Sequence, residues 1–133
     1  MSEVRSSLTG SVALVPTMGH LHEGHLSLVR KARNENEVLC VSIFVNPLQF
    51  DVKEDFDGYP RDHDKDLELL KQESVDILFL PDDQEVYPDD FNQWIELPGT
   101  ITSHWEGNSR PGHFRGVTTV VARLLDIIRP GCI

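Results

Sequence analysis

The chain has little cysteine and little positive charge, and each shortage excludes a class of protein. Its 133 residues include only two cysteines, Cys40 and Cys132, which form neither a disulfide framework nor a metal-binding spacing. We therefore expect a reducing cytoplasmic location, with Cys40 buried in an apolar run. The 12 Lys and Arg residues stand against 22 Asp and Glu residues. The net charge of −10 argues against nucleic acid or an anionic membrane as the main partner.

Long apolar segments are also missing. No apolar run reaches the length of a membrane span, and the N-terminal residues lack the apolar stretch of a secretory signal. The length and the ordinary composition suit one globular domain, so we expect a single domain over residues 1–133. Acidic residues gather between Asp51 and Asp66, where we expect a solvated loop and helix face rather than a metal site.

Apolar runs alternate with helical periodicity along the chain. The predicted elements are buried strands at 11–18, 38–45 and 75–80, helices at 23–36, 61–73 and about 116–129, and a short strand at 94–97. The apolar faces expected of the three helices are Leu26, Leu28, Val29 and Ala32; Leu67, Leu69 and Leu70; and Val117, Val120, Val121, Leu124, Leu125 and Ile128. This rhythm predicts an α/β fold with a parallel sheet and right-handed crossovers.

The segment Pro16–His25 carries the clearest chemical signal. It lies where the first predicted strand turns into the first helix, and backbone N–H groups and the helix dipole face a ligand at such turns. Gly19 and Gly24 would let the backbone approach a polyanion, and His22 and His25 can donate hydrogen bonds to phosphate oxygens. A metal half-site or two surface histidines are the alternatives. The preceding strand, the glycines and the following helix favour a nucleotide-phosphate site.

A second loop, at residues 46–60, is long enough to suggest a function. Its first residues follow the second predicted strand, and ligands bind beyond the carboxyl ends of parallel strands. We therefore expect Gln49 near the two histidines. Further along, Arg110 and Arg115 either face an anion or a partner subunit, or pair with nearby acids to hold the last helix.

Four segments, taken together, resemble one family. They are Val15–His25, Ser42–Phe50, Asp55–Arg61 and Ser109–Val117, which occur in order and at matching spacing. They resemble pantothenate synthetase, or pantoate–β-alanine ligase, of the H-x-G-H nucleotidyltransferase superfamily. The resemblance covers roughly residues 12–130 and implies a Rossmann-like domain. The segments at 45–50 and 110–116 disfavour a different H-x-G-H nucleotidyltransferase that makes a dinucleotide.

The resemblance implies a reaction and a set of residues. ATP, with Mg²⁺, would convert pantoate to pantoyl adenylate, and β-alanine would then displace AMP to give pantothenate. The implied ATP site comprises Met18, Gly19, His20, Leu21, His22, Glu23, Gly24 and His25, with His25 as general acid. Gln49 and Asn46 would bind pantoate and β-alanine. The family also implies a homodimer.

The sequence departs from the family by being short. Family members continue past residue 130 into a strand that carries an ATP-binding lysine, a Ser-rich loop and a C-terminal domain. We therefore expect a truncated sheet whose first strand has an open edge, covered by a partner or by the rest of a longer product. The alternative function is a catalytically inactive module that binds nucleotide or pantoate.

Overall fold

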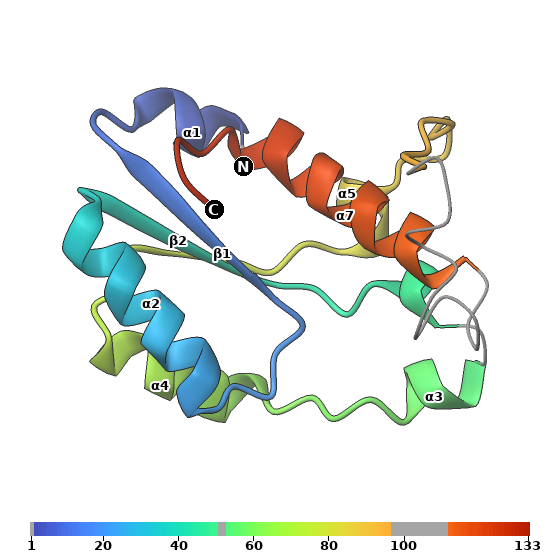
Figure 1. The fold of residues 1–133 in the computed structure, drawn as a ribbon, viewed down its shortest axis with the longest axis horizontal. Coiled ribbons are helices and arrows are strands. Elements are labelled where there is room, and N and C mark those ends of the chain that lie inside the picture. Colours follow the sequence, from blue (N-terminus) through green and yellow to red (C-terminus); the bar gives the residue numbers. More distant parts are fainter. Residues whose placement is uncertain (1, 51–52, 97–111) are drawn as a thin grey trace.

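Three parallel strands form the centre of the molecule. The computed structural model describes residues 2–50, 53–96 and 112–133 (Figure 1). The strands are β1 (Val12–Thr17), β2 (Val38–Ile43) and β3 (Ile77–Phe79), in the spatial order β1-β2-β3. Val12 pairs with Val38, and Cys40 with Ile77. The predicted parallel α/β architecture is confirmed. β1 and β2 are each two residues shorter than predicted, and β3 is half its predicted length.

Three helices were predicted, and several shorter ones were not. The helices are α1 (Ser2–Ser7), α2 (Glu23–Glu35), the 3-10 turn η1 (Pro47–Gln49), α3 (Lys53–Asp57), α4 (His63–Gln72), α5 (Asp83–Val86) and α7 (His113–Ile128). The predicted helices correspond to α2, α4 and α7. The strand predicted at 94–97 is wrong over 94–96, while Leu97 lies outside the described residues. Ile95 instead bonds to α7, through Thr118 Oγ1 and Thr119 Oγ1.

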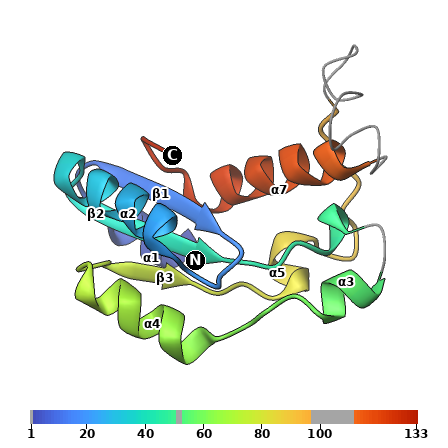
Figure 2. The same ribbon diagram turned by 60° about the horizontal axis from the view of Figure 1, so that its bottom comes forward.

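The sheet separates two apolar clusters, because side chains alternate across a strand. Ala13, Val15 and Val41 pack on one face with Val29 of α2 and Leu70 of α4. On the other face, a second cluster joins β1 and β2 to α7, and its buried members include Leu14, Cys40, Phe44, Val120, Leu124 and Ile128. Figures 1 and 2 show α4 and α7 on opposite sides of the strands. Cys40 is fully buried and free, as predicted.

Three leucines predicted to face inward do not. Leu28, Leu67 and Leu125 are 56%, 37% and 37% exposed. A helix turns by about 100° per residue, and each of these leucines lies roughly that far or farther from the buried face of its helix. The predicted apolar stripes were therefore one residue too wide.

The outer edge of β1 is partly paired. Leu14 N–H donates to Cys132 O (2.9 Å) and Gly131 N–H donates to Val12 O (2.8 Å), so the chain's last residues run parallel to the start of β1. Pro16 falls on the same side of the strand and has no N–H to leave unpaired. The edge predicted to be open is thus covered only at its beginning.

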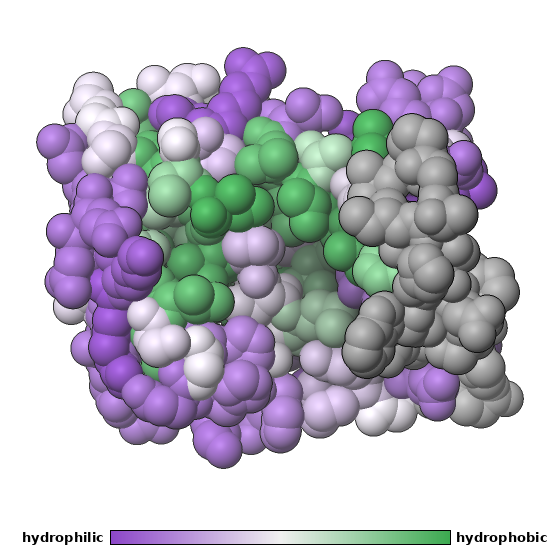
Figure 3. Space-filling model, in the orientation of Figure 1, coloured by the Kyte–Doolittle hydropathy of each residue, from purple (hydrophilic) through white to green (hydrophobic). Residues whose placement is uncertain are grey.

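An apolar groove of about 560 Å³ follows the rest of this edge. Figure 3 shows its hydrophobic surface over β1 with a polar border. The lining residues are Ala13, Leu14, Val15, Pro16, Leu28, Lys31, Ala32, Glu35, Cys132 and Ile133. Leu28 and Ile133 are its most exposed apolar side chains, at 56% and 58%. Within the residues that the structure describes, no helix combines the length and the apolar character needed to cross a membrane.

Candidate functional site

The loop between β1 and α2 has a tightly defined backbone. Gly19 (φ 81°) and His20 (φ 52°) both adopt the left-handed conformation, which most residues avoid. A Cβ atom on Gly19 would lie 3.0 Å from Asp66 Oδ2 and 3.1 Å from Ile43 Cγ2. The positive φ favours glycine at position 19, and the two close neighbours leave little space for a side chain.

His22 and His25 form a reciprocal cap at the start of α2. His22 is the N-cap residue, and its Nδ1 accepts the Gly24 N–H (3.1 Å). His25 Nδ1 accepts the His22 N–H (3.4 Å), and the two ring centroids are 4.1 Å apart. A neutral imidazole has one donor and one acceptor nitrogen. Since both Nδ1 atoms accept, both neutral rings carry their proton on Nε2. Among the described residues, neither Nε2–H group has a hydrogen-bond partner.

The surroundings of His25 favour its neutral form. Partial burial lowers its pKa from 6.5, the neighbouring His22 lowers it further, and the charge of Asp66 opposes both effects. Without a ligand, His25 at neutral pH is therefore a neutral hydrogen-bond donor. A bound polyanion would raise this pKa, because a nearby negative charge stabilises the imidazolium.

Most backbone donors of the loop are already used within the protein. His20 N–H and Leu21 N–H donate to Asp66 Oδ2 and Oδ1, at 2.8 Å each. Gly19 N–H donates to Thr17 Oγ1 (3.2 Å). The sequence suggested that free loop amides would face the phosphate, but in the structure these three amides face inward. The donors that remain for an anion are the imidazole Nε2 groups and the N-terminal end of α2.

Asn46 and Gln49 form a second pair, at the end of β2. Asn46 is fully buried, and its Nδ2 donates to Gln49 Oε1 (2.9 Å) and Gly116 O (3.1 Å). Its Oδ1 accepts from Tyr87 Oη (2.8 Å) and Leu48 N–H (3.3 Å). The Asn46 amide thus has both donor hydrogens and both acceptor positions engaged. Gln49 Oε1 is engaged by Asn46, and within the described residues its amide NH2 group has no hydrogen-bond partner.

Helix α7 holds this pair against the sheet. A Cβ atom on Gly116 would lie 2.2 Å from Leu48 O, so glycine lets α7 approach η1 closely. His113 Nδ1 donates to Gln49 O (3.1 Å). Burial raises the pKa of Tyr87, so its hydroxyl remains a neutral donor to Asn46. Neither Tyr87 nor Gly116 was singled out from the sequence.

Four of the predicted site residues therefore form two pairs in the structure. His22 with His25 follows β1, and Asn46 with Gln49 follows β2, and Figure 1 shows both loops leaving the same edge of the sheet. Asp66, from α4, bonds to the loop that precedes the first pair, although its segment was predicted to be solvated. It is only 2% exposed. Its spacing of three and four residues from Leu69 and Leu70 places it on the same face of the helix, and this spacing could have predicted its burial.

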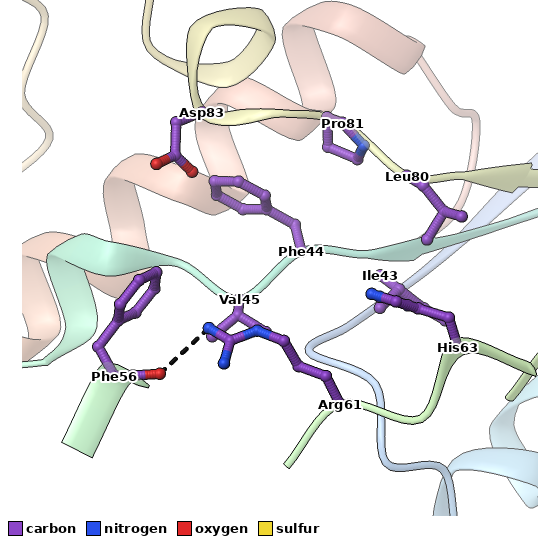
Figure 4. Close-up of a pocket in the computed structure, with 9 residues that line it drawn as sticks. All are labelled: Ile43, Phe44, Val45, Phe56, Arg61, His63, Leu80, Pro81 and Asp83. Carbon is purple, nitrogen blue, oxygen red and sulfur yellow. Dashed lines mark hydrogen bonds between the residues drawn. The ribbon is translucent and has the colours of Figure 1, made fainter. Parts of the chain in front are cut away.

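A separate hollow of about 260 Å³ lies at the ends of β2 and β3, and none of the predicted site residues lines it (Figure 4). Arg61 crosses it and donates to Phe56 O (3.1 Å). Elsewhere, Arg115 pairs with Glu96 (3.1 Å) and stacks on Trp94, which supports the ion-pair interpretation for this arginine. Arg110 lies outside the described residues. In the part of the chain that is described, no three His, Cys, Asp or Glu side chains gather as a metal site.

Comparison with known proteins identifies the family. A family model for pantoate-beta-alanine ligase matches residues 1–133. The chain belongs to this family. The resemblance drawn from the four sequence segments is therefore confirmed.

Relatives and solved structures of this family agree with the match. The chain is 55% identical over 120 residues to a pantothenate synthetase of Thermotoga petrophila, covering 90% of this chain and 42% of that one. A crystal structure of the Thermus thermophilus enzyme superposes with a TM-score of 0.90 at 51% identity, covering 96% and 47% of the two chains. The pantoate-beta-alanine ligase of Francisella tularensis, complexed with beta-gamma ATP and beta-alanine, gives 0.93 at 46% identity, covering 97% and 50%. The chain thus spans about half the length of these ligases.

Proposed function

We propose that this chain provides the ATP-binding half of a pantoate–β-alanine ligase. In the proposed reaction, a pantoate carboxylate oxygen attacks the α-phosphate of ATP and releases pyrophosphate. The amine of β-alanine then attacks the acyl adenylate and releases AMP. Family membership supports this assignment, as does the solved relative that holds a form of ATP together with β-alanine.

The observation that carries the proposal is the reciprocal cap of His22 and His25. It leaves two Nε2–H donors beside the N-terminus of α2. Negative charge grows on the α-phosphate and on the leaving pyrophosphate during adenylation, and fixed donors stabilise it. We assign residues 18–25 to the ATP site. His25 acts as the general acid once bound phosphate has raised its pKa.

The second pair serves the other substrates. Gln49 offers its NH2 group to a carboxylate or hydroxyl oxygen of pantoate or β-alanine. Asn46, predicted to contact substrate as well, has its hydrogen-bonding groups engaged by the protein. We propose that Asn46 supports the substrates by holding Gln49 in place.

Mg²⁺ accompanies ATP in the proposed reaction. The described residues present no set of three metal-binding side chains. Magnesium in nucleotide sites commonly uses phosphate oxygens, water and few protein ligands, which fits this donor set. We therefore assign no protein ligand to the ion.

Exchange of labelled pyrophosphate into ATP, dependent on pantoate, tests adenylation by this chain. We expect exchange with the unmodified protein and a loss of about a hundredfold in His25→Ala, the scale of a positioned proton donor. His63→Ala makes the same change at an exposed histidine outside the site, and we expect it to exchange normally. Equal rates for His25→Ala and the unmodified chain would refute the catalytic role of His25.

The same assay separates the alternative function. No exchange, combined with an ATP-dependent rise in melting temperature, would favour a binding module without turnover. That outcome is pertinent because the chain spans about half of its relatives' length. The absence of both exchange and ATP-dependent stabilisation would refute the proposed ATP site.

Two substitutions test Gln49. Gln49→Ala removes the free NH2 group and should weaken pantoate binding while leaving ATP binding nearly intact. Gln49→Glu keeps an oxygen for Asn46 but replaces the NH2 group with negative charge, so it should weaken binding of the pantoate carboxylate further. Isothermal titration with each ligand gives the comparison. Pantoate affinity that is unchanged in both variants would exclude the contact.

We further propose a cytoplasmic homodimer whose ligands are small molecules, with neither nucleic acid nor a membrane as partner. The family resemblance supports the dimer, and the net charge of −10 disfavours polyanionic partners. Sedimentation velocity at micromolar concentration tests the assembly. A purely monomeric protein would contradict it.

A further inference from the structure

We infer that Asp66 is a positioning residue, which holds the β1–α2 loop in the conformation that aims His22 and His25 at the nucleotide. This inference rests on the proposed ATP site and adds to it a carboxylate from another helix. Asp66 bonds to backbone amides of predicted site residues, and we assign it no direct contact with ATP. It acts through the backbone of the loop.

The geometry of the contact is specific. Asp66 Oδ2 accepts the His20 N–H and Oδ1 accepts the Leu21 N–H, both at 2.8 Å, so one carboxylate binds two consecutive amides. The side chain is 2% exposed, and water does not compete freely for these bonds. Hydrogen bonds to an ionised acceptor are stronger than neutral ones. Asp66 therefore fixes two adjacent peptide groups at once.

The fixed segment is one that would not keep its shape unaided. His20 has a φ of 52°, which is unfavourable for a residue with a Cβ atom, and Gly19 before it has a φ of 81°. His22, the N-cap of α2, follows directly after the bound Leu21 amide. Releasing the two amides would let the loop relax and would shift the residue on which the imidazole pair depends.

Because Asp66 is negatively charged, the direction in which its removal changes ATP affinity shows whether it positions the loop. A buried negative charge beneath a nucleotide site repels phosphate, so electrostatics alone would select against it. If Asp66 had no positioning role, removing its charge would strengthen ATP binding. If it positions the loop, the same change weakens ATP binding.

The test compares Asp66→Asn with Asp64→Asn, which makes the same change of charge at an exposed position of the same helix. Asparagine has one acceptor oxygen where the carboxylate has two, so one loop amide loses its partner. In Asp66→Asn we expect hydrogen exchange of the His20 and Leu21 amides to become at least about tenfold faster. The dissociation constant of ATP should rise about tenfold, which is the effect of losing one charge-assisted hydrogen bond. Asp64→Asn should change neither by more than about twofold.

A readout from the imidazoles tests whether the charge of Asp66 lies close to His25 in the folded protein. Among the described residues, the charged groups that affect the pKa of His25 are His22 at the cap and Asp66 from α4. In Asp66→Asn, NMR titration should give a lower pKa for His25, because the carboxylate charge that raises it is gone. In Asp64→Asn this pKa should stay unchanged. Tighter ATP binding in Asp66→Asn, or hydrogen exchange of the His20 and Leu21 amides as slow as in the unmodified chain, would overturn the inference.

Measurements on the unmodified chain keep the inference testable if Asp66→Asn does not fold. The His20 and Leu21 amides lie in a loop, so slow hydrogen exchange there requires the carboxylate bonds. Exchange at the rate of an open chain in the folded protein would refute the inference. These amides report on Asp66 even if the protein proves not to bind ATP, so failure of the proposed function would be separately visible.

Discussion

Truncation of Asn46 should destabilise the protein far more than truncation of an ordinary asparagine. Its buried side chain makes four hydrogen bonds, which join η1 to α7 and to Tyr87. Asn46→Ala removes all four and leaves Gly116 O without its side-chain partner. A neutral hydrogen bond contributes about 0.5–1.5 kcal/mol net, and a buried group left unpaired costs about 1–3 kcal/mol.

These values give an estimate for the whole substitution. The bond to Gly116 O is fully buried, whereas the other three are partly accessible and can be replaced by water. We therefore expect Asn46→Ala to lower the free energy of unfolding by about 2–3 kcal/mol. Asn34→Ala, at an exposed position in α2, should change it by less than about 0.5 kcal/mol.

Urea denaturation, followed by circular dichroism, measures both changes. Tyr87→Phe removes only the hydroxyl donor and should cost about 0.5–1.5 kcal/mol. When it is combined with Asn46→Ala, that cost should largely disappear, because the acceptor of the Tyr87 hydroxyl is already absent. The hydrogen-bond network around Asn46 would be contradicted if Asn46→Ala destabilises the protein no more than Asn34→Ala. Additive effects of Tyr87→Phe and Asn46→Ala in the double variant would contradict it as well.

Three further predictions follow from single contacts. Gly116→Ala places a methyl group 2.2 Å from Leu48 O, so it should lower the free energy of unfolding, measured in urea, by about 1–3 kcal/mol. Gly131→Ala, whose Cβ atom would lie 3.8 Å from its nearest neighbour, should be nearly neutral. Equal stabilities of the two variants would contradict the close approach of α7. In native protein one thiol should react with a disulfide reagent, because Cys132 is exposed while burial of Cys40 raises its pKa to about 12. Both thiols should react in denaturant, and Cys132→Ser should abolish the reaction of the native protein. Two reactive thiols in the native protein would contradict the burial of Cys40. His25 should titrate below 6.5 without ligand, so its contribution to stability is present above pH 6.5 and is lost as the pH falls through the lowered pKa. His25→Gln should remove that part of the acid sensitivity, and an NMR midpoint at or above 6.5 would contradict this reasoning.

The sheet and its main helices could be predicted because their signals are local. A continuous apolar run becomes a buried parallel strand wherever it meets another, and the runs before Pro16 and Asn46 did so. The loop after β1 was predictable for the same reason, since a glycine and two histidines lie within one short segment. The short helices α3 and α5 carry no comparable run. Each has only four or five residues and depends on its surroundings.

The environment of the second pair could not be read from its own segment. Asn46 is bound by Tyr87, 41 residues away, and binds Gly116, 70 residues away. An asparagine before a proline usually indicates a turn, and here it also caps η1. A side-chain amide can form only a fixed number of hydrogen bonds. Only the folded positions of the partners show that those of Asn46 are all made within the protein, whereas the NH2 group of Gln49 has no partner among the described residues.

Asp66 shows what a closer use of the sequence would have found. It precedes Leu69 and Leu70 by three and four residues, so any helix that buries those leucines turns position 66 toward the core as well. A carboxylate there must meet several donors or remain unstable, and α4 itself supplies none from its own interior backbone. The nearest unsatisfied donors in a parallel α/β fold belong to a loop at the carboxyl edge, where glycine at 19 permits the chain to turn its amides inward. A carboxylate within an apolar helical stripe therefore requires buried donors, and in this chain the donors belong to the loop that presents His22 and His25.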